Sequence, residues 1–197
     1  IIPLDDERLW YRYHHLFADY LRSLLSKTEQ ATLYQKAAIW HETNELTTEA
    51  VHYALSSGNV HFAAEVIENA LGKNATWSDG NLAQLVAWLE ALPQEAFHSR
   101  PRLGLHAARA FYIQGSFEKA EMQIEQAERN LQFLPATPET DELRAIATLN
   151  RGAIAAVRGD FQQVLALVPA AQARLPRESH LWQARANFSL GLAHEIT

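Results

Sequence analysis

Two adjacent histidines, His14 and His15, follow Arg12 near the N-terminus and lie among tyrosines, leucines and a phenylalanine. Histidine titrates near neutral pH and is a common metal ligand. A histidine pair beside an arginine therefore suggests a metal site, a general base or a phosphate contact. Each of these roles needs partner residues elsewhere in the chain, and the remaining sequence decides whether they exist.

Complete catalytic or metal-binding motifs are missing from the sequence. His41-Glu42 and His194-Glu195 each begin like the H-E-x-x-H zinc motif, but Glu45 occupies the second histidine position of the first and the sequence ends within the second. There is no cysteine, no glycine-rich phosphate loop and no G-x-S-x-G elbow. We therefore expect the chain not to be an enzyme and to hold no metal or cofactor.

A second group of chemically suited residues lies beyond residue 100, where arginines and aromatic residues recur at helical spacing. Guanidinium groups bind anions through paired hydrogen bonds, and aromatic rings stack on flat ligands. Such a face suits a polyhydroxylated or anionic ligand, although it is also compatible with an ordinary solvated helix face. The candidate ligand-binding residues are Arg102, Arg109, Tyr112, Arg185, Phe188 and Glu195.

The composition limits the class of protein that positions these residues. The 197 residues are 48% hydrophobic and 20% charged, with a net charge of −6. Leucine and alanine dominate the apolar residues, which favours helices. The basic residues are scattered, so nucleic-acid binding is not expected. No apolar run approaches the roughly 20 residues of a membrane span, and the absence of cysteine is typical of a reducing compartment, so we expect a cytoplasmic protein.

A helical repeat is the strongest pattern in the chain. Two ladders of apolar residues have the same spacing, 44 positions apart, and each follows a glycine, Gly115 or Gly159. A small residue, Ala108 or Gly152, lies seven positions before each glycine, and a third copy begins near Leu181. The ladders are Phe117, Ala120, Ile124, Ala127 and Leu131, and then Phe161, Val164, Val168, Ala171 and Leu175.

This spacing predicts pairs of helices in which the glycine forms the turn and the small residue lets the two helices approach closely. The register is close to a tetratricopeptide motif, although Gly104 and Thr148 replace its tryptophan and the repeats are longer than usual. The first helix of each pair would line the concave face of a right-handed superhelix. The candidate ligand-binding residues all fall on these first helices.

The residues before 100 predict shorter elements. Residues 1–13 have two apolar or aromatic runs around a polar turn and predict a β-hairpin that includes Trp10. Helical spacing follows from His14, with Trp40 and Trp88 expected in the core and Trp77 and Trp182 at the surface. We expect an all-α fold with three parts: residues 1–27, a helical linker over residues 28–99, and repeats over residues 100–197.

Several stretches resemble one family, the MalT-like large ATP-binding regulators of the LuxR type. They are WYRYHHLFADYLRSLL (10–25), AAIWHETNELTTEAVHYALSSGN (37–59), LVAWLEALPQEAFHSRPRL (85–103) and AARAFYIQGSFEKAEMQIEQAE (107–128). The resemblance implies that residues 1–27 end a winged helix, that a linker follows, and that the superhelical sensor starts at residue 100. Because the sequence begins with Ile1 and ends within the repeat pattern, we expect a piece of a longer protein.

The resemblance also implies a function: transcription regulation by a signal-transduction ATPase. The chain would bind a small-molecule inducer or a regulatory protein and couple that event to self-association and to ATP or ADP on a separate ATPase domain. His14 or His15 would contact that nucleotide, or else both pack at a helix start. The chain has no Walker motif and no helix-turn-helix, so we expect neither ATP hydrolysis nor DNA binding by it alone. The alternative is a stand-alone tetratricopeptide-like interaction scaffold.

Overall fold

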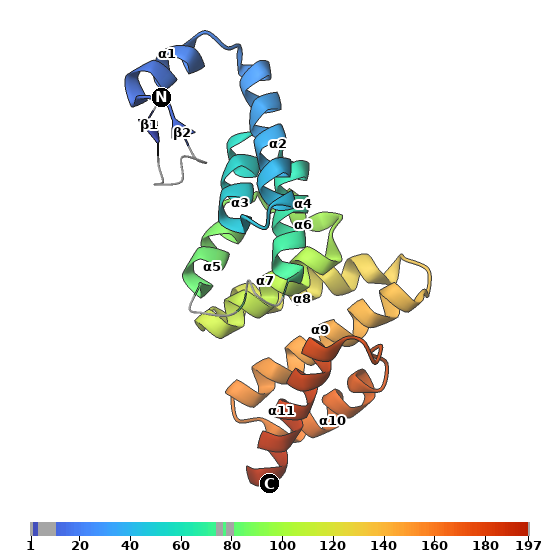
Figure 1. Ribbon diagram of the computed structural model, residues 1–197. Coiled ribbons are helices and arrows are strands. Elements are labelled where there is room, and N and C mark those ends of the chain that lie inside the picture. Colours follow the sequence, from blue (N-terminus) through green and yellow to red (C-terminus); the bar gives the residue numbers. More distant parts are fainter. Residues whose placement is uncertain (1, 4–10, 74–76, 78–80, 197) are drawn as a thin grey trace. The chain divides into compact units, whose positions relative to one another are not determined.

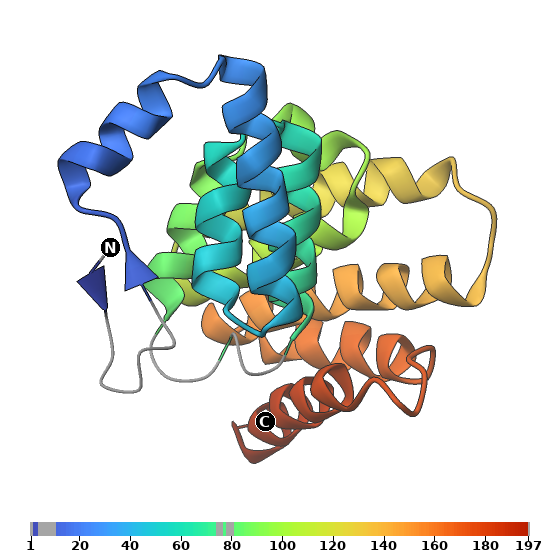
Figure 2. The ribbon, with the colours of Figure 1, turned by 45° about the horizontal axis from the view of Figure 1, so that its top comes forward.

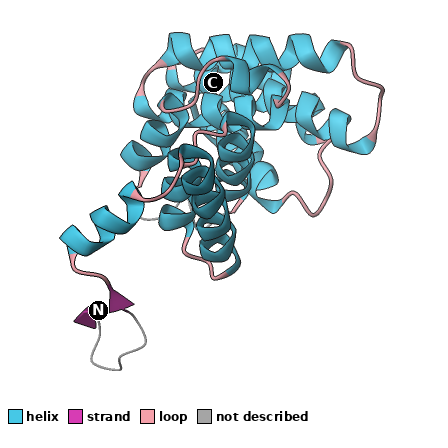
Figure 3. Ribbon diagram, turned by 90° about the horizontal axis from the view of Figure 1, so that it is seen from above, coloured by secondary structure: helices cyan, strands magenta, loops and turns pink. Residues whose placement is uncertain are grey.

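The structure, a computed structural model, describes residues 2–3, 11–73, 77 and 81–196. Helices make up nearly all the regular structure in these residues, so the all-α class is confirmed (Figure 1 and Figure 3). Contacts divide the chain into two compact units, residues 1–63 and residues 64–197, which we call the N-terminal and C-terminal units. The part boundaries expected after residues 27 and 99 stay predictions.

The N-terminal unit starts with two short strands. Strand β1 (Ile2–Pro3) pairs antiparallel with β2 (Tyr11–Arg12), and Ile2 lies opposite Arg12. Residues 4–10, which include the expected polar turn and Trp10, lie outside the described residues. Helix α1 (His15–Ser23) follows and has no buried residue, although Leu16, Phe17 and Tyr20 have helical spacing.

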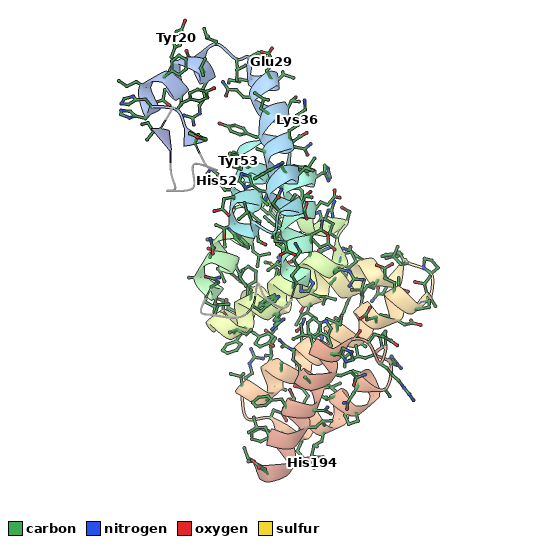
Figure 4. The ribbon with its side chains drawn as sticks, in the orientation of Figure 1. Tyr20, Glu29, Lys36, His52, Tyr53 and His194 are labelled. Atoms are coloured by element: carbon green, nitrogen blue, oxygen red, sulfur yellow. The ribbon has the colours of Figure 1, made fainter. Side chains whose placement is uncertain are left out.

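Helices α2 (Lys27–Thr43) and α3 (Thr47–Ser56) pack together in the same unit. A capping box starts α2, because the Ser26 and Glu29 side chains each accept a hydrogen bond from the other residue's backbone N–H. Tyr53 of α3, labelled in Figure 4, stacks on His41 of α2 at a centroid distance of 5.1 Å. The core position expected for Trp40 is wrong: its side chain is 48% exposed, because α3 covers a different side of α2.

The C-terminal unit contains the repeat-like helices. After α4 (Val60–Gly72), which spans the unit boundary, come α5 (Leu82–Glu90) and the single turn α6 (Glu95–His98). The longer helices are α7 (Pro101–Gln114), α8 (Phe117–Gln132), α9 (Pro138–Val157), α10 (Phe161–Gln172) and α11 (His180–Ile196). Helix α7 packs on α8, α9 packs on α10, and α11 packs on both α9 and α10 (Figure 2).

The turns between paired helices follow from their glycines. Gly115 ends α7 with a φ of 91°, and Gly159 follows α9 with a φ of 77°. This left-handed region is costly for residues with a Cβ atom, so the two glycines reverse the chain at low strain. The expected ladders are largely buried, and Ile124 and Val164 are fully so.

The close approach of the paired helices depends on a missing side chain. A Cβ atom at Gly152 of α9 would lie 2.6 Å from Cγ2 of Val168 in α10. Two residues earlier on α9, Asn150 is fully buried, and its Nδ2 donates a hydrogen bond to the Leu105 carbonyl oxygen of α7 at 3.0 Å. These two positions hold α9 against α10 and against α7. Among the described helices, none combines the length and apolar character that crossing a membrane requires.

Candidate ligand-binding site

Helices α7 and α11 carry the candidate site, and each presents two residues three positions apart on one face. Arg109 and Tyr112 lie on α7, and Trp182 and Arg185 lie on α11. Residues at this spacing are neighbours on a helix surface, so each helix offers one cation beside one ring. Trp77 adds a ring from the segment before α5.

These five side chains alternate in space as ring, cation, ring, cation, ring. The Arg109 guanidinium carbon lies 3.8 Å from the ring centroid of Trp77 and 5.9 Å from that of Trp182. The Arg185 guanidinium carbon lies 5.0 Å from the Trp182 centroid and 5.5 Å from the Tyr112 centroid. We call this set the arginine–aromatic stack. The rings hold the guanidinium groups by cation–π attraction and by covering their faces.

Hydrogen bonds fix parts of the stack but leave others open. The indole Nε1 of Trp77 donates to the Leu71 carbonyl oxygen at 2.7 Å, which anchors the ring. Arg109 is only 8% exposed, yet its Nε and Nη1 atoms are buried and have no hydrogen-bond partner among the described residues. An unpaired buried cation is costly, because desolvation is not offset by attraction to a partner. The binding of an anion at the stack would therefore be favourable, because it would give the buried cation a partner.

The electrostatics of the stack show the same imbalance. Burial lowers the pKa of Arg109 to about 10. Burial, and then the positive charge of Arg109, lowers the pKa of Arg185 to about 9. Burial lowers the pKa of His106 to about 3, and the charges of Arg102, Arg109 and Arg185 add to this effect. At neutral pH the site therefore has two buried or half-buried cations beside a neutral imidazole.

Other arginines in the same unit are paired with carboxylates. Arg151 binds Glu128 through two hydrogen bonds of 3.0 and 2.6 Å, and this pairing raises its pKa. Arg144 contacts Asp141 at 2.8 Å, and Arg158 contacts Glu121 at 2.7 Å. By contrast, neither Arg109 nor Arg185 forms an ion pair with a carboxylate among the described residues, and burial lowers the pKa of each.

An apolar cavity of about 410 Å³ adjoins the stack. It lies within the C-terminal unit and shares Arg185 and Tyr112 with the stack. Its other walls come from α9 and α11 and are nearly all aliphatic or aromatic. They are Ala153, Ala156, Val157, Leu181, Ala184, Phe188, Ser189 and Leu192. Cation and cavity together suit a ligand with one charged end and one apolar end.

Four of the residues selected from the sequence lie together in this region. Arg109, Tyr112 and Arg185 belong to the stack, and Phe188, whose side chain is 73% exposed, lines the cavity. Sequence reasoning missed His106 as a site residue and treated Trp77 and Trp182 only as surface residues. The surface position expected for Trp182 is wrong, because its side chain is only 7% exposed. Their positions offered one signal: both tryptophans lie outside the apolar ladders that build the repeat core.

The other selected residues lie elsewhere. Arg102 forms a 3.0 Å ion pair with Glu139. Its positive charge still helps to lower the pKa of His106. Glu195 is exposed near the end of α11, next to His194, which Figure 4 labels. His14 and His15 are exposed at the start of α1 in the N-terminal unit, with ring centroids 4.2 Å apart.

Comparison with known proteins finds a family model that matches the first part of the chain. Residues 1–33 match the MalT winged helix domain. The chain is also 30% identical over 166 residues to the serine/threonine-protein kinase PknK of Mycobacterium tuberculosis and of Mycobacterium bovis. The alignment covers 79% of this chain but only 14% of those relatives. No solved structure is significantly similar to the chain. These findings support the MalT-like resemblance and a protein of the regulator type.

Proposed function

We propose that the chain is the linker and sensor part of an ATP-dependent transcriptional regulator of the MalT-like group. Its C-terminal unit would bind a small-molecule inducer or a regulatory protein at the arginine–aromatic stack. The observation that carries this proposal is the pair of cations, Arg109 and Arg185, without a carboxylate partner among the described residues and beside an apolar cavity. The winged-helix match at residues 1–33 supports the regulator class.

In this proposal the repeats are tetratricopeptide-like and form the start of a superhelix. The turns at Gly115 and Gly159 and the contact at Gly152 support this interpretation. Helices α7, α9 and α11 would be the first helices of successive repeats and would form the concave face. Both the cavity and the stack draw on these helices, which is the location at which such arrays bind ligands.

The remaining roles concern the longer protein. An ATPase domain of the same polypeptide would bind ATP or ADP, and ligand binding would favour self-association in the cytoplasm. The chain itself would neither catalyse a reaction nor bind nucleic acid. The exposed apolar residues of α1, Leu16, Phe17 and Tyr20, support a role for this helix in contacts with another domain.

The flanking gene sequence tests this proposal. We expect a Walker motif upstream and a helix-turn-helix downstream, because a regulator needs both to bind nucleotide and DNA. The absence of both would overturn the proposal and favour a stand-alone interaction scaffold.

The histidine pair allows a second test in the full-length protein. If His14 or His15 contacts the nucleotide, replacing that residue with alanine will weaken ADP binding, whereas the other replacement will leave it unchanged. Both side chains are exposed, so neither replacement should affect folding. ADP affinity that is unchanged from the unsubstituted protein in both variants would remove the nucleotide role from this pair.

A further inference from the structure

The charged and apolar parts of the candidate site share one residue that points to the ligand class. Arg185 stacks on Trp182 and Tyr112 and also lines the cavity. Because the rings cover its faces, the edge of its guanidinium group is the part suited to a ligand. That edge carries N–H donors in the geometry that matches a carboxylate.

The charge of the site favours an anion. The Arg109 guanidinium carbon lies 5.9 Å from the Trp182 ring centroid, and two of its buried nitrogen atoms have no hydrogen-bond partner among the described residues. Its positive charge acts on Arg185. An anion at Arg185 would be attracted by both guanidinium groups in a partly desolvated environment, where charge interactions are stronger than in water. A neutral ligand would leave the repulsion between the two cations in place.

The cavity restricts the rest of the ligand to an apolar group. Ala153 and Ala156 provide space on α9, while Phe188 and Leu192 provide apolar walls on α11. Sugar hydroxyls placed here would lose hydrogen bonds to water and find few partners, which costs free energy. An apolar body would instead remove Phe188, now 73% exposed, from water. A volume of about 410 Å³ suits a small molecule rather than a peptide helix.

We propose that the C-terminal unit binds small amphipathic carboxylic acids, with the carboxylate on Arg185 and the apolar body in the cavity. This inference rests on the proposed sensor function and specifies its ligand. It favours an organic acid over the polyhydroxylated ligand that the sequence alone also allowed.

Isothermal titration calorimetry on the 197-residue chain tests the ligand class directly. The probes are octanoate and 3-phenylpropionate, their uncharged amides octanamide and 3-phenylpropanamide, and glucose 6-phosphate with inorganic phosphate as polar anions. We expect the acids to bind about tenfold or more tightly than their amides, because only the acids carry the charge. We expect the polar anions to bind more weakly than the acids, because they have no apolar body.

Two variants test where the acids bind. Arg185→Gln removes the charge and should weaken octanoate binding about tenfold or more, whereas the control Arg177→Gln, at an exposed position before α11, should leave it unchanged. Ala156→Leu fills part of the cavity and should weaken the binding of 3-phenylpropionate more than that of inorganic phosphate, which has no apolar body. Circular dichroism and Tm measurements will verify that each variant is folded.

Three results would overturn the inference: equal affinity for acids and amides, unchanged octanoate binding by Arg185→Gln, or no binding of either acid to the folded chain. Tighter Arg185-dependent binding of glucose 6-phosphate than of the acids would also overturn the ligand class, while the sensor function would stand. Conversely, the chain could bind the acids while its gene encodes no flanking ATPase or DNA-binding motif. That result would overturn the regulator proposal and leave the binding site in place.

Discussion

Helices α1 and α7 have similar patterns of apolar residues but very different surroundings. Every residue from 103 to 112 in α7 is buried, whereas α1 has no buried residue, and Leu16 is 67% exposed. Helix α7 packs against α5, α6, α8 and α9, but no described element packs extensively on α1. Periodicity therefore identifies the apolar face of a helix, and the presence of a packing partner decides whether that face is a core or a contact surface.

This difference predicts that substitutions around α7 destabilise the chain strongly and that substitutions in α1 do not. The largest effect is expected for Ile124→Ala in α8, because Ile124 is fully buried against the neighbouring helices. This substitution removes buried side-chain atoms and should lower the free energy of unfolding by about 2–5 kcal/mol. Chemical denaturation followed by circular dichroism measures it, with the exposed Met122→Ala on the same helix as the control. A loss no larger than that of the control would contradict the packing described for α8.

A smaller loss is expected where helices approach closely. Gly152→Ala places a Cβ atom 2.6 Å from Val168, so the helices must separate or the valine must shift. The expected cost is about 1–3 kcal/mol. Gly191→Ala in α11 is the matched control, since a Cβ atom there meets nothing within 4 Å and alanine favours the helix. If both substitutions stabilised the chain, the close contact between α9 and α10 would be refuted.

A pH dependence of similar size follows from His106. Its pKa is lowered to about 3 in the folded chain by burial and by three arginines, against about 6.5 when unfolded. Between these values the unfolded state binds the proton and the folded state does not, so stability is full above pH 6.5 and falls as the pH falls toward 3.

The expected loss from this residue between pH 6 and pH 5 is about 1 kcal/mol. Urea denaturation at both pH values measures it. His106→Gln should remove this slope, whereas His98→Gln, at an exposed position, should retain it. An unchanged slope in His106→Gln would mean that His106 is not buried in its neutral form.

The smallest effect is expected in α1. Phe17→Ala should change the free energy of unfolding by no more than about 0.5 kcal/mol, because the Phe17 side chain is already 49% exposed. Thermal and urea denaturation of the chain measure this. A loss comparable to that of Gly152→Ala would show that α1 packs within the chain, and the contrast with α7 would then fail.

The paired helices of the C-terminal unit could be predicted well because their local signals agree with their packing. The glycines before each ladder, the small residue at position 152 and the ladders themselves all act within one helical hairpin. Trp40 was assigned to the core wrongly, because its helix has the right spacing but α3 covers another side. Local spacing contains no information about which neighbour is present.

The candidate site could be predicted only in part for a related reason. The helical register placed Arg109 and Tyr112 on one face and Arg185 and Phe188 on another, which the structure brings together. Trp77 comes from a different segment, and His106 acts through burial, so neither is visible from the spacing of the repeats. That neither arginine has a carboxylate partner among the described residues also depends on the three-dimensional arrangement.

The buried side chain of Asn150 limits how the helices can move. Its amide holds the Leu105 carbonyl oxygen of α7 at 3.0 Å from inside α9. Sliding α9 along α7 by one residue, about 1.5 Å, would break this bond and leave a polar amide without a partner in an apolar interior. Rotation about the bond does not. The hydrogen bond therefore opposes sliding of α9 along α7 more than it opposes a change of the angle between the two helices.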